Sequence, residues 1–472
     1  MGRIVHVWGP AFLGLALGVL ALWPALGPGF VLRYDMVFVP DPPILPDTGG
    51  FPRAMPSDLV VALLSGVLPD QLVQKGILLG IFVLAASGAA ALVPGERLLP
   101  RLAAAAFYAW NIYLAQRLLL GQWALLLGFA GLPWVVHAAG RRWWHLALAL
   151  LPAAAGGFQA MLVTVLTLVG VAPRRLWLPA VLALPWLVPA LAADAATDPA
   201  GVDAFAARAD GPFGTLGSLL SLGGVWNAEA GVPGQDGWWP ASARLLLALV
   251  GLAGFVRLRG KVTWWRGLAL AASAGLVIAC AGAFAPGLVK ALIAGWPGFG
   301  PLRDGQAYLA PLVLAAAVGF GTLVPHWLGV LAPLLVLPTF ALGAFGRLAA
   351  VDYPADWLAV QRIVNADPAP GAVLSLPWGA HRAFAWNGGR VVLDPATKLF
   401  ERRVVWDDGL SVKLPDGLRL RVRGEDLGER PPIRYVLIAG DENRFLAQYP
   451  GWGVAYRGQE VVLLRVPGGT RG

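Results

Sequence analysis

Three aspartates lie in the proline-rich segment that follows the first apolar run of the chain. The segment reads PGFVLRYDMVFVPDPPILPDTGG and contains Asp35, Asp41 and Asp47. Asp35 has apolar neighbours and stands two residues after Arg33, so we expect it to be desolvated, which raises the pKa of a carboxylate. Such a carboxylate is suited to take a proton from an acceptor hydroxyl. The alternative is a structural ion pair with Arg33 or Arg303.

The same loop offers oxygen ligands for a divalent cation. Carboxylates suit Mg²⁺ and Mn²⁺, so Asp35 and Asp41 are candidate metal ligands. Asp41 and Asp47 also fit turns, where an aspartate side chain accepts backbone hydrogen bonds. The sequence indicates no other cofactor, because it lacks a P-loop, a nucleotide-binding glycine fingerprint, an HExxH motif and a CxxC motif. Metal binding therefore stays open.

Two further segments carry candidate substrate-binding residues at the ends of apolar runs. In PLRDGQAY, Arg303 could clamp a phosphate by bidentate hydrogen bonds, while Asp304 is also a good first residue for a helix. In YAWNIYLAQRLLLGQW, an arginine so placed should face a cavity or lipid headgroups, and snorkelling to the interface is the alternative. We therefore predict that the following residues bind substrate: Arg33, Arg117, Gln122, Arg303 and Asp304.

His381, in PWGAHRAFAW, is the one histidine that we expect outside the cytoplasm. We interpret it as a polar surface residue, and contact with a ligand is the alternative.

Composition predicts an α-helical polytopic membrane protein. Of 472 residues, 57% are hydrophobic and 13% are charged, whereas a soluble domain has roughly 25% charged residues. The net charge of +9 is concentrated in short clusters between apolar runs, such as GRR at 140–142 and RLRGKVTWWR at 257–266. Such clusters anchor membrane spans on the cytoplasmic side and do not form a groove for nucleic acid.

We predict about 11 spans, beginning with an uncleaved signal anchor in a multi-pass plasma-membrane protein. With the N-terminus in the cytoplasm, that side holds eleven Arg and Lys residues and one acid, Glu96. The positive-inside rule favours this orientation, which places the C-terminus outside. The expected spans are 7–26, 72–94, 101–114, 121–139, 143–156, 158–173, 176–193, 242–258, 267–284, 306–324 and 327–347.

The chain divides by composition into two predicted domains. Residues 1–348 form the transmembrane domain, with an acid-bearing external loop at 27–71 and a second external loop at 194–241. The second loop is too long to be a mere connector, so we expect it to cover a site. Residues 349–472 have no run long enough to span a membrane, and they alternate short β-like segments with turns. We expect them to form a small extracytoplasmic α/β domain.

The order of these parts resembles the GT-C superfamily of multispanning glycosyltransferases, and in particular its uncharacterised bacterial members. The resemblance rests on the amphipathic stretch PSDLVVALLSGVLPDQ, on RLLLGQWALLLGFAGLPWV, on GFGPLRDGQAYLAPLVLA and on the tail segments YPADWLAVQRIV, VLSLPWG and RVVLDPA. In that superfamily the first external loop carries an essential acid, which Asp35 matches. The adjacent acidic pair of many members is missing here, because Tyr34 and Met36 flank Asp35.

The resemblance implies an inverting transferase that uses a polyprenyl-phosphate sugar on the external face of the membrane. The acceptor would be an envelope glycan, a glycolipid or a glycoprotein. Two alternatives remain: a non-catalytic subunit that binds a membrane protein partner, and a lipid transporter or flippase. Few charges lie within the predicted spans, and ion-coupled transporters usually need several.

Overall fold

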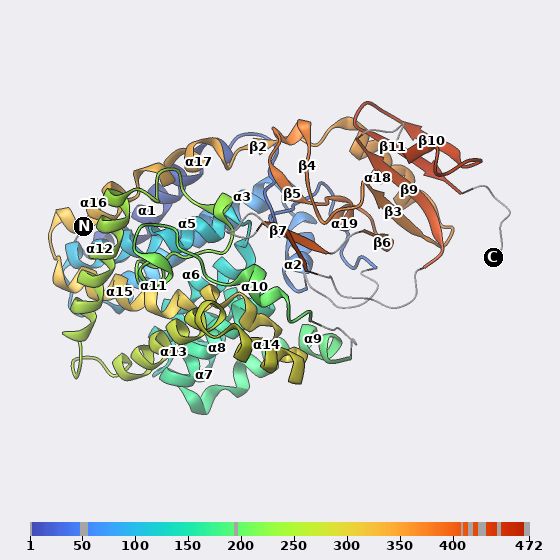
Figure 1. The fold of residues 1–472 in the computed structure, drawn as a ribbon. Coiled ribbons are helices and arrows are strands. Elements are labelled where there is room, and N and C mark those ends of the chain that lie inside the picture. The colour runs from blue at the N-terminus through green and yellow to red at the C-terminus, as the bar shows by residue number, and fades with distance from the viewer. Residues whose placement is uncertain are drawn as a thin grey trace.

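The computed structural model describes residues 2–47, 55–192, 197–406, 409–413, 419–422, 431–440 and 445–466. A helical body holds the first three quarters of the chain, and a smaller part rich in strands follows it (Figure 1). The main helices of the body are α1 (Gly2–Leu22), α3 (Asp70–Leu92), α4 (Leu98–Ala109), α6 (Trp123–Ala138), α7 (Trp143–Gly156), α8 (Phe158–Val171), α9 (Trp177–Ala192), α12 (Trp238–Val256), α13 (Trp265–Phe284), α15 (Ala310–Leu323) and α16 (Trp327–Val336).

Five helices in the described part are long and apolar enough to cross a membrane, and a pair bent by 69° at its break makes a sixth. Several other predicted spans form shorter apolar helices of 10–17 residues. The structure thus confirms a mostly helical membrane protein, whereas the predicted count of about 11 spans is not confirmed. One reason is local: the run at 101–114 breaks after Ala109, where Asn111 caps a new helix by accepting a hydrogen bond from Leu114 N at 2.9 Å.

Small residues allow close approach between the central helices. A Cβ atom on Gly254 of α12 would lie 2.0 Å from the Gly319 carbonyl oxygen of α15, and one on Gly251 would lie 2.4 Å from the Ala316 oxygen. Without a hydrophobic driving force inside a bilayer, such backbone contact is how helices associate.

The strand-rich part contains a five-stranded mixed sheet. Its order is β10 (Gly453–Arg457), β11 (Val461–Arg465), β9 (Ile433–Ala439), β3 (Ala372–Leu376) and β6 (Val404–Val405). β3 runs parallel to β9 and β6, while β11 runs antiparallel to its two neighbours.

Helix α18 (Ala355–Ala366) buries an apolar stripe of Trp357, Val360 and Val364. This is the 3.6-residue periodicity of an amphipathic helix. β4 (His381–Ala383) and β5 (Val391–Leu393) form a separate antiparallel pair.

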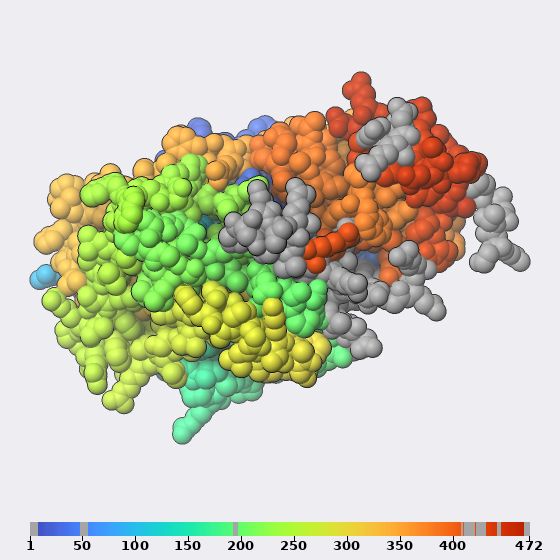
Figure 2. All heavy atoms as spheres, viewed as in Figure 1, coloured from blue at the N-terminus to red at the C-terminus, as the bar shows by residue number. Residues whose placement is uncertain are grey.

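The acid-bearing loop joins the two parts of the molecule. Its first residues form β1 (Phe30–Val31), which pairs antiparallel with β2 (Ala350–Val351). Tyr34 then bridges to β5, since Tyr34 N donates to the Val391 oxygen at 2.7 Å and Tyr34 O accepts from Leu393 N at 2.8 Å. In the space-filling view little of the blue N-terminal segment is visible on this face (Figure 2). The loop is therefore held between the helical body and the C-terminal part.

Candidate functional site

Asp35 lies at the tip of a tight turn that packs on the loop between α5 (Ile112–Leu119) and α6. The Asp35 amide donates to the Leu120 oxygen at 3.2 Å. Gly121 has a φ of +75°, and a Cβ atom there would lie 2.3 Å from both the Arg33 oxygen and the Met36 nitrogen. The glycine of the GQW stretch is therefore required twice, for its left-handed backbone and for this close approach.

The Asp35 carboxylate pairs with His381, because its Oδ1 atom lies 3.2 Å from Nε2 of the imidazole. The Asp35 side chain is 53% exposed. Our expectation that apolar neighbours desolvate it is wrong, since Met36 points into the core and Asp35, at the turn, points outward. The structural ion pair that we considered with Arg33 or Arg303 is replaced by this contact with His381.

Arg33 turns away from Asp35 and holds the second long loop. Its Nε donates to the Leu119 oxygen at 2.9 Å, and its Nη2 donates to the Glu229 oxygen at 3.0 Å. The Tyr34 hydroxyl donates to Glu229 Oε2 at 2.7 Å. Burial, together with this hydrogen bond, raises the pKa of Tyr34 to about 12. The loop at 194–241 thus meets the acid-bearing loop next to Asp35.

Sequence reasoning did not single out Glu229. It stands 195 residues from Tyr34, and no local pattern links the two positions. Its carboxylate is exposed beside Asp35's turn, so it adds a second acidic group to this surface.

A second cluster of polar side chains lies inside the helical body and is centred on Arg117 of α5. Its guanidinium makes a two-pronged contact with Asp304, at 2.7 Å and 3.0 Å. Gln122 accepts a hydrogen bond from the same guanidinium at 2.6 Å, and Gln306 accepts one at 3.4 Å. The Arg117 side chain is 2% exposed and that of Asp304 is 11% exposed.

Asp304 precedes the 3₁₀ turn Gly305–Leu309 but makes no side-chain cap hydrogen bond. Its carboxylate is committed to Arg117, and Gln159 Nε2 approaches it at 3.5 Å. Arg303, next in sequence, has its guanidinium 5.0 Å from the centre of the Phe205 ring and is half-buried.

One short segment connects the two groups. On one side Arg117 holds Asp304 and also donates to Gln122, while on the other the carbonyls of Leu119 and Leu120 accept from Arg33 and Asp35. Five of the predicted site residues therefore meet around residues 117–122, and Arg303 adjoins them in sequence. Their role in binding or catalysis stays a prediction.

The structure offers no cluster for a metal ion within the part of the chain that it describes. There, no group of three or more His, Cys, Asp or Glu side chains is placed to hold one. Asp41, a candidate ligand, uses its amide to donate to Asp70 Oδ2 at 3.0 Å and its carbonyl to accept from Gln361.

Comparison with solved structures identifies the fold. The chain is similar to the mycobacterial arabinofuranosyltransferase AftD, with a TM-score of 0.53 and 16% sequence identity over 98% of this chain. A mutant form of the same enzyme gives a TM-score of 0.52 and 15% identity over 97%. The fold is GT-C-like. The chain spans only 40% and 41% of those two chains. No protein-family model matches the sequence, and no curated protein matches it either.

Proposed function

We propose that this protein is a membrane glycosyltransferase of cell-envelope assembly, which transfers a sugar from a polyprenyl phosphate to an envelope acceptor on the external face. The observation that carries the proposal is the Asp35–His381 pair, an exposed carboxylate beside a partly buried imidazole on the acid-bearing loop. The GT-C-like fold and the likeness to an arabinofuranosyltransferase support it. In this proposal the acid-bearing loop and residues 349–472 are external, and the N-terminus is cytoplasmic.

The geometry suits general-base catalysis. With the proton on Nε2, His381 donates to Asp35 Oδ1 and fixes the carboxylate, leaving Oδ2 to accept the proton of an acceptor hydroxyl. The hydroxyl oxygen then attacks the anomeric carbon, the bond from that carbon to the phosphate oxygen breaks, and the lipid phosphate leaves with its electron pair. Attack opposite the leaving group inverts the anomeric centre.

The remaining site residues take different parts in this proposal. Arg303 is the candidate for holding the leaving phosphate, because a guanidinium matches phosphate oxygens. Arg117 acts as a positioning residue, since its donors are committed to Asp304, Gln122 and Gln306. Its pairing fixes the segment that carries the Asp35 turn.

The test replaces Asp35 and His381 separately in the full-length protein. Asp35→Asn keeps the shape and the contact with His381 but removes the base, so we expect kcat to fall by about 10²-fold or more. His381→Gln keeps a donor at that position, so we expect a smaller loss. Product formation is measured in membranes supplied with polyprenyl-phosphate sugars, and by comparing envelope glycans of cells that carry each variant.

Asp47→Asn is the matched control, because it changes an exposed carboxylate of the same loop that is not among the predicted site residues. It should leave product formation unchanged. If Asp35→Asn is folded and forms product at the wild-type rate, the base assignment fails. If no variant changes the glycans and the protein co-purifies with a stoichiometric partner, the non-catalytic alternative replaces the proposal.

A further inference from the structure

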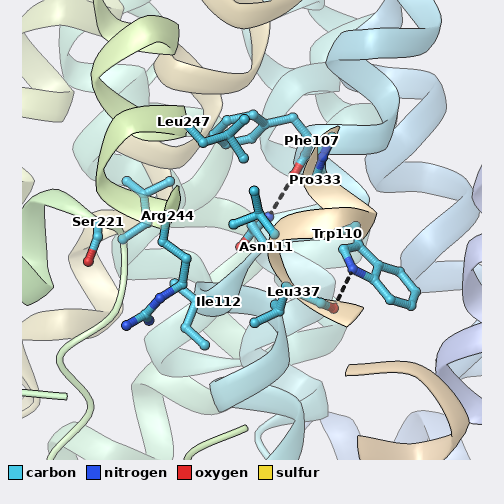
Figure 3. Close-up of a pocket in the computed structure, with 11 residues that line it drawn as sticks. Phe107, Trp110, Asn111, Ile112, Ser221, Arg244, Leu247, Pro333 and Leu337 are labelled. Atoms are coloured by element: carbon cyan, nitrogen blue, oxygen red, sulfur yellow. Dashed lines mark hydrogen bonds between the residues drawn. The ribbon is translucent and has the colours of Figure 1, made fainter. Parts of the chain in front are cut away.

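A small pocket lies where α4, α5, α12 and α16 meet (Figure 3). Three polar residues line it: Arg244 of α12, Asn111 before α5, and Ser221 of the second long loop. Its other walls are apolar and include Phe107, Trp110 and Leu247.

Arg244 is buried, at 5% exposure, and is incompletely paired. Its Nη2 atom donates to the Gln235 carbonyl at 2.9 Å and reaches the Asp210 carbonyl and carboxylate at 3.4 Å each. Its Nε and Nη1 atoms are sealed from solvent and have no partner among the residues that the structure describes. Buried donors are almost always hydrogen-bonded, so these two need an explanation.

The carboxylate nearest Arg244 is also shared with other donors. Asp210 Oδ2 accepts from Gln116 Nε2 and from Gly224 N, both at 2.8 Å. The buried pair of Arg117 and Asp304 is different, because there two nitrogens meet two oxygens at 2.7 Å and 3.0 Å. An under-compensated buried cation is costly, and it favours an anionic ligand.

The position of the pocket indicates a ligand from the bilayer. Trp238 and Trp239, at the start of α12, are 70% and 82% exposed, which is typical of side chains at a membrane–water interface. Arg244 lies about 9 Å along the helix from Trp238. It therefore sits close to the depth of lipid headgroups, with the apolar walls of the pocket beside it.

We propose that Arg244 binds the phosphate of a membrane lipid, whose hydrocarbon chain lies against Phe107, Trp110 and Leu247. A guanidinium is well matched to phosphate, and the apolar walls are matched to a hydrocarbon chain. To reach the phosphate, Arg244 swings toward the mouth of the pocket. That movement gives up one contact of 2.9 Å and two of 3.4 Å.

The site is separate from the proposed catalytic group, although one helix serves both. On α5, Gln116 reaches toward the partners of Arg244, and the next residue, Arg117, reaches toward Asp304. The inference does not depend on sugar transfer, so each can fail without the other.

Native mass spectrometry of the purified full-length protein tests it. Three probes are added in turn: phosphatidylglycerol, diacylglycerol with the same chains, and inorganic phosphate. We expect one phosphatidylglycerol per protein, weaker binding of diacylglycerol, and no competition from inorganic phosphate. In Arg244→Met, phosphatidylglycerol should bind about tenfold more weakly or worse, the loss expected for a charge-assisted hydrogen bond.

Two further variants guard against misfolding and non-specific effects. Leu247→Trp fills the apolar part of the pocket while leaving the contacts of Arg244 in place, and it should also weaken lipid binding. Arg257→Met removes an exposed arginine at the other end of α12, and it should bind lipid as the wild type does. Equal phosphatidylglycerol binding by wild type, Arg244→Met and Leu247→Trp would overturn the proposal. Tight binding of inorganic phosphate alone would overturn it as well. A density map of the lipid-treated protein that shows only a water molecule beside Arg244 would do the same.

Discussion

The buried pair of Arg117 and Asp304 can be measured by replacing its members one at a time and together. In Asp304→Leu the guanidinium keeps only the amide oxygens of Gln122 and Gln306. In Arg117→Met the carboxylate keeps only the 3.5 Å approach of Gln159. Removing one partner of a buried ion pair costs about 3–5 kcal/mol, because the other charge stays buried without compensation.

The double variant Arg117→Met/Asp304→Leu leaves no buried charge behind. Replacing a buried pair by apolar side chains is often close to neutral. We therefore expect the double variant to be more stable than either single variant by about 2 kcal/mol or more. The free energy of unfolding can be followed by tryptophan fluorescence during titration of mixed micelles with a denaturing detergent, since the chain has 21 tryptophans.

Lys290 and Asp203 form a matched pair at 2.6 Å whose side chains are 37% and 42% exposed. Lys290→Met should cost about 1 kcal/mol or less, as surface pairs do. If the single variants of Arg117 and Asp304 cost no more than this control, water reaches the pair and screens its charges, which would contradict the reasoning. If the double variant is stable but forms no product, Arg117 or Asp304 has a further role with substrate.

Three further outcomes follow from particular residues. Gly121→Ala should lower the free energy of unfolding by about 2 kcal/mol more than Gly95→Ala. Both glycines have a positive φ, but only at Gly121 would a Cβ atom lie within 2.3 Å of the backbone of the acid-bearing loop. Unfolding titrations compare the two variants, and equal losses would contradict this packing. A hydrogen bond from Tyr435 holds the pKa of Asp367 well below its usual range. The ionised carboxylate therefore stabilises the fold fully above about pH 4, and this stabilisation is lost as the pH falls further. Asp367→Asn should destabilise the protein at pH 7 and flatten the loss of stability in acid, and an unchanged dependence on acid pH would contradict this role. Burial raises the pKa of Tyr34 to about 12, so the contribution of the neutral phenol to stability is full below about pH 10 and is lost as the pH rises through 12. The ultraviolet difference spectrum between wild type and Tyr34→Phe should show phenolate only near pH 12. Phenolate at pH 10 would contradict the burial of this side chain.

Local sequence patterns predict much of the fold, because apolar runs and short alternating segments reflect how residues are buried along one stretch of chain. Hydropathy placed the helices but overestimated how many are long enough to span a membrane. Prolines lie inside α6, α7, α9 and α16, and several of these helices end after 10–16 residues. Where a proline ends or bends a helix, the length of the helix that remains depends on backbone geometry, which an average of hydropathy does not contain.

The partners of the site residues were harder to predict, because they come from distant parts of the chain. Asp35 and His381 are 346 residues apart, and Arg117 and Asp304 are 187 residues apart. The sequence singled out Asp35, Arg117 and Asp304 as candidate site residues, whereas it indicated only a polar surface residue at His381. It did not indicate which would meet. The contact of Arg117 with Asp304 depends on how the helices pack, and that of Asp35 with His381 depends on how β1 and Tyr34 attach to the C-terminal part.

The pairing of β1 with β2 also imposes an order on biogenesis. Asp35 leaves the ribosome before His381, the histidine that it contacts, which is made 346 residues later. At about 5–20 residues per second, that interval is roughly 20–70 s. During that interval β1 and the Asp35 turn have neither β2 nor His381 to pair with. Truncated chains that lose the tail would remain in that unfinished state, however well their helices insert.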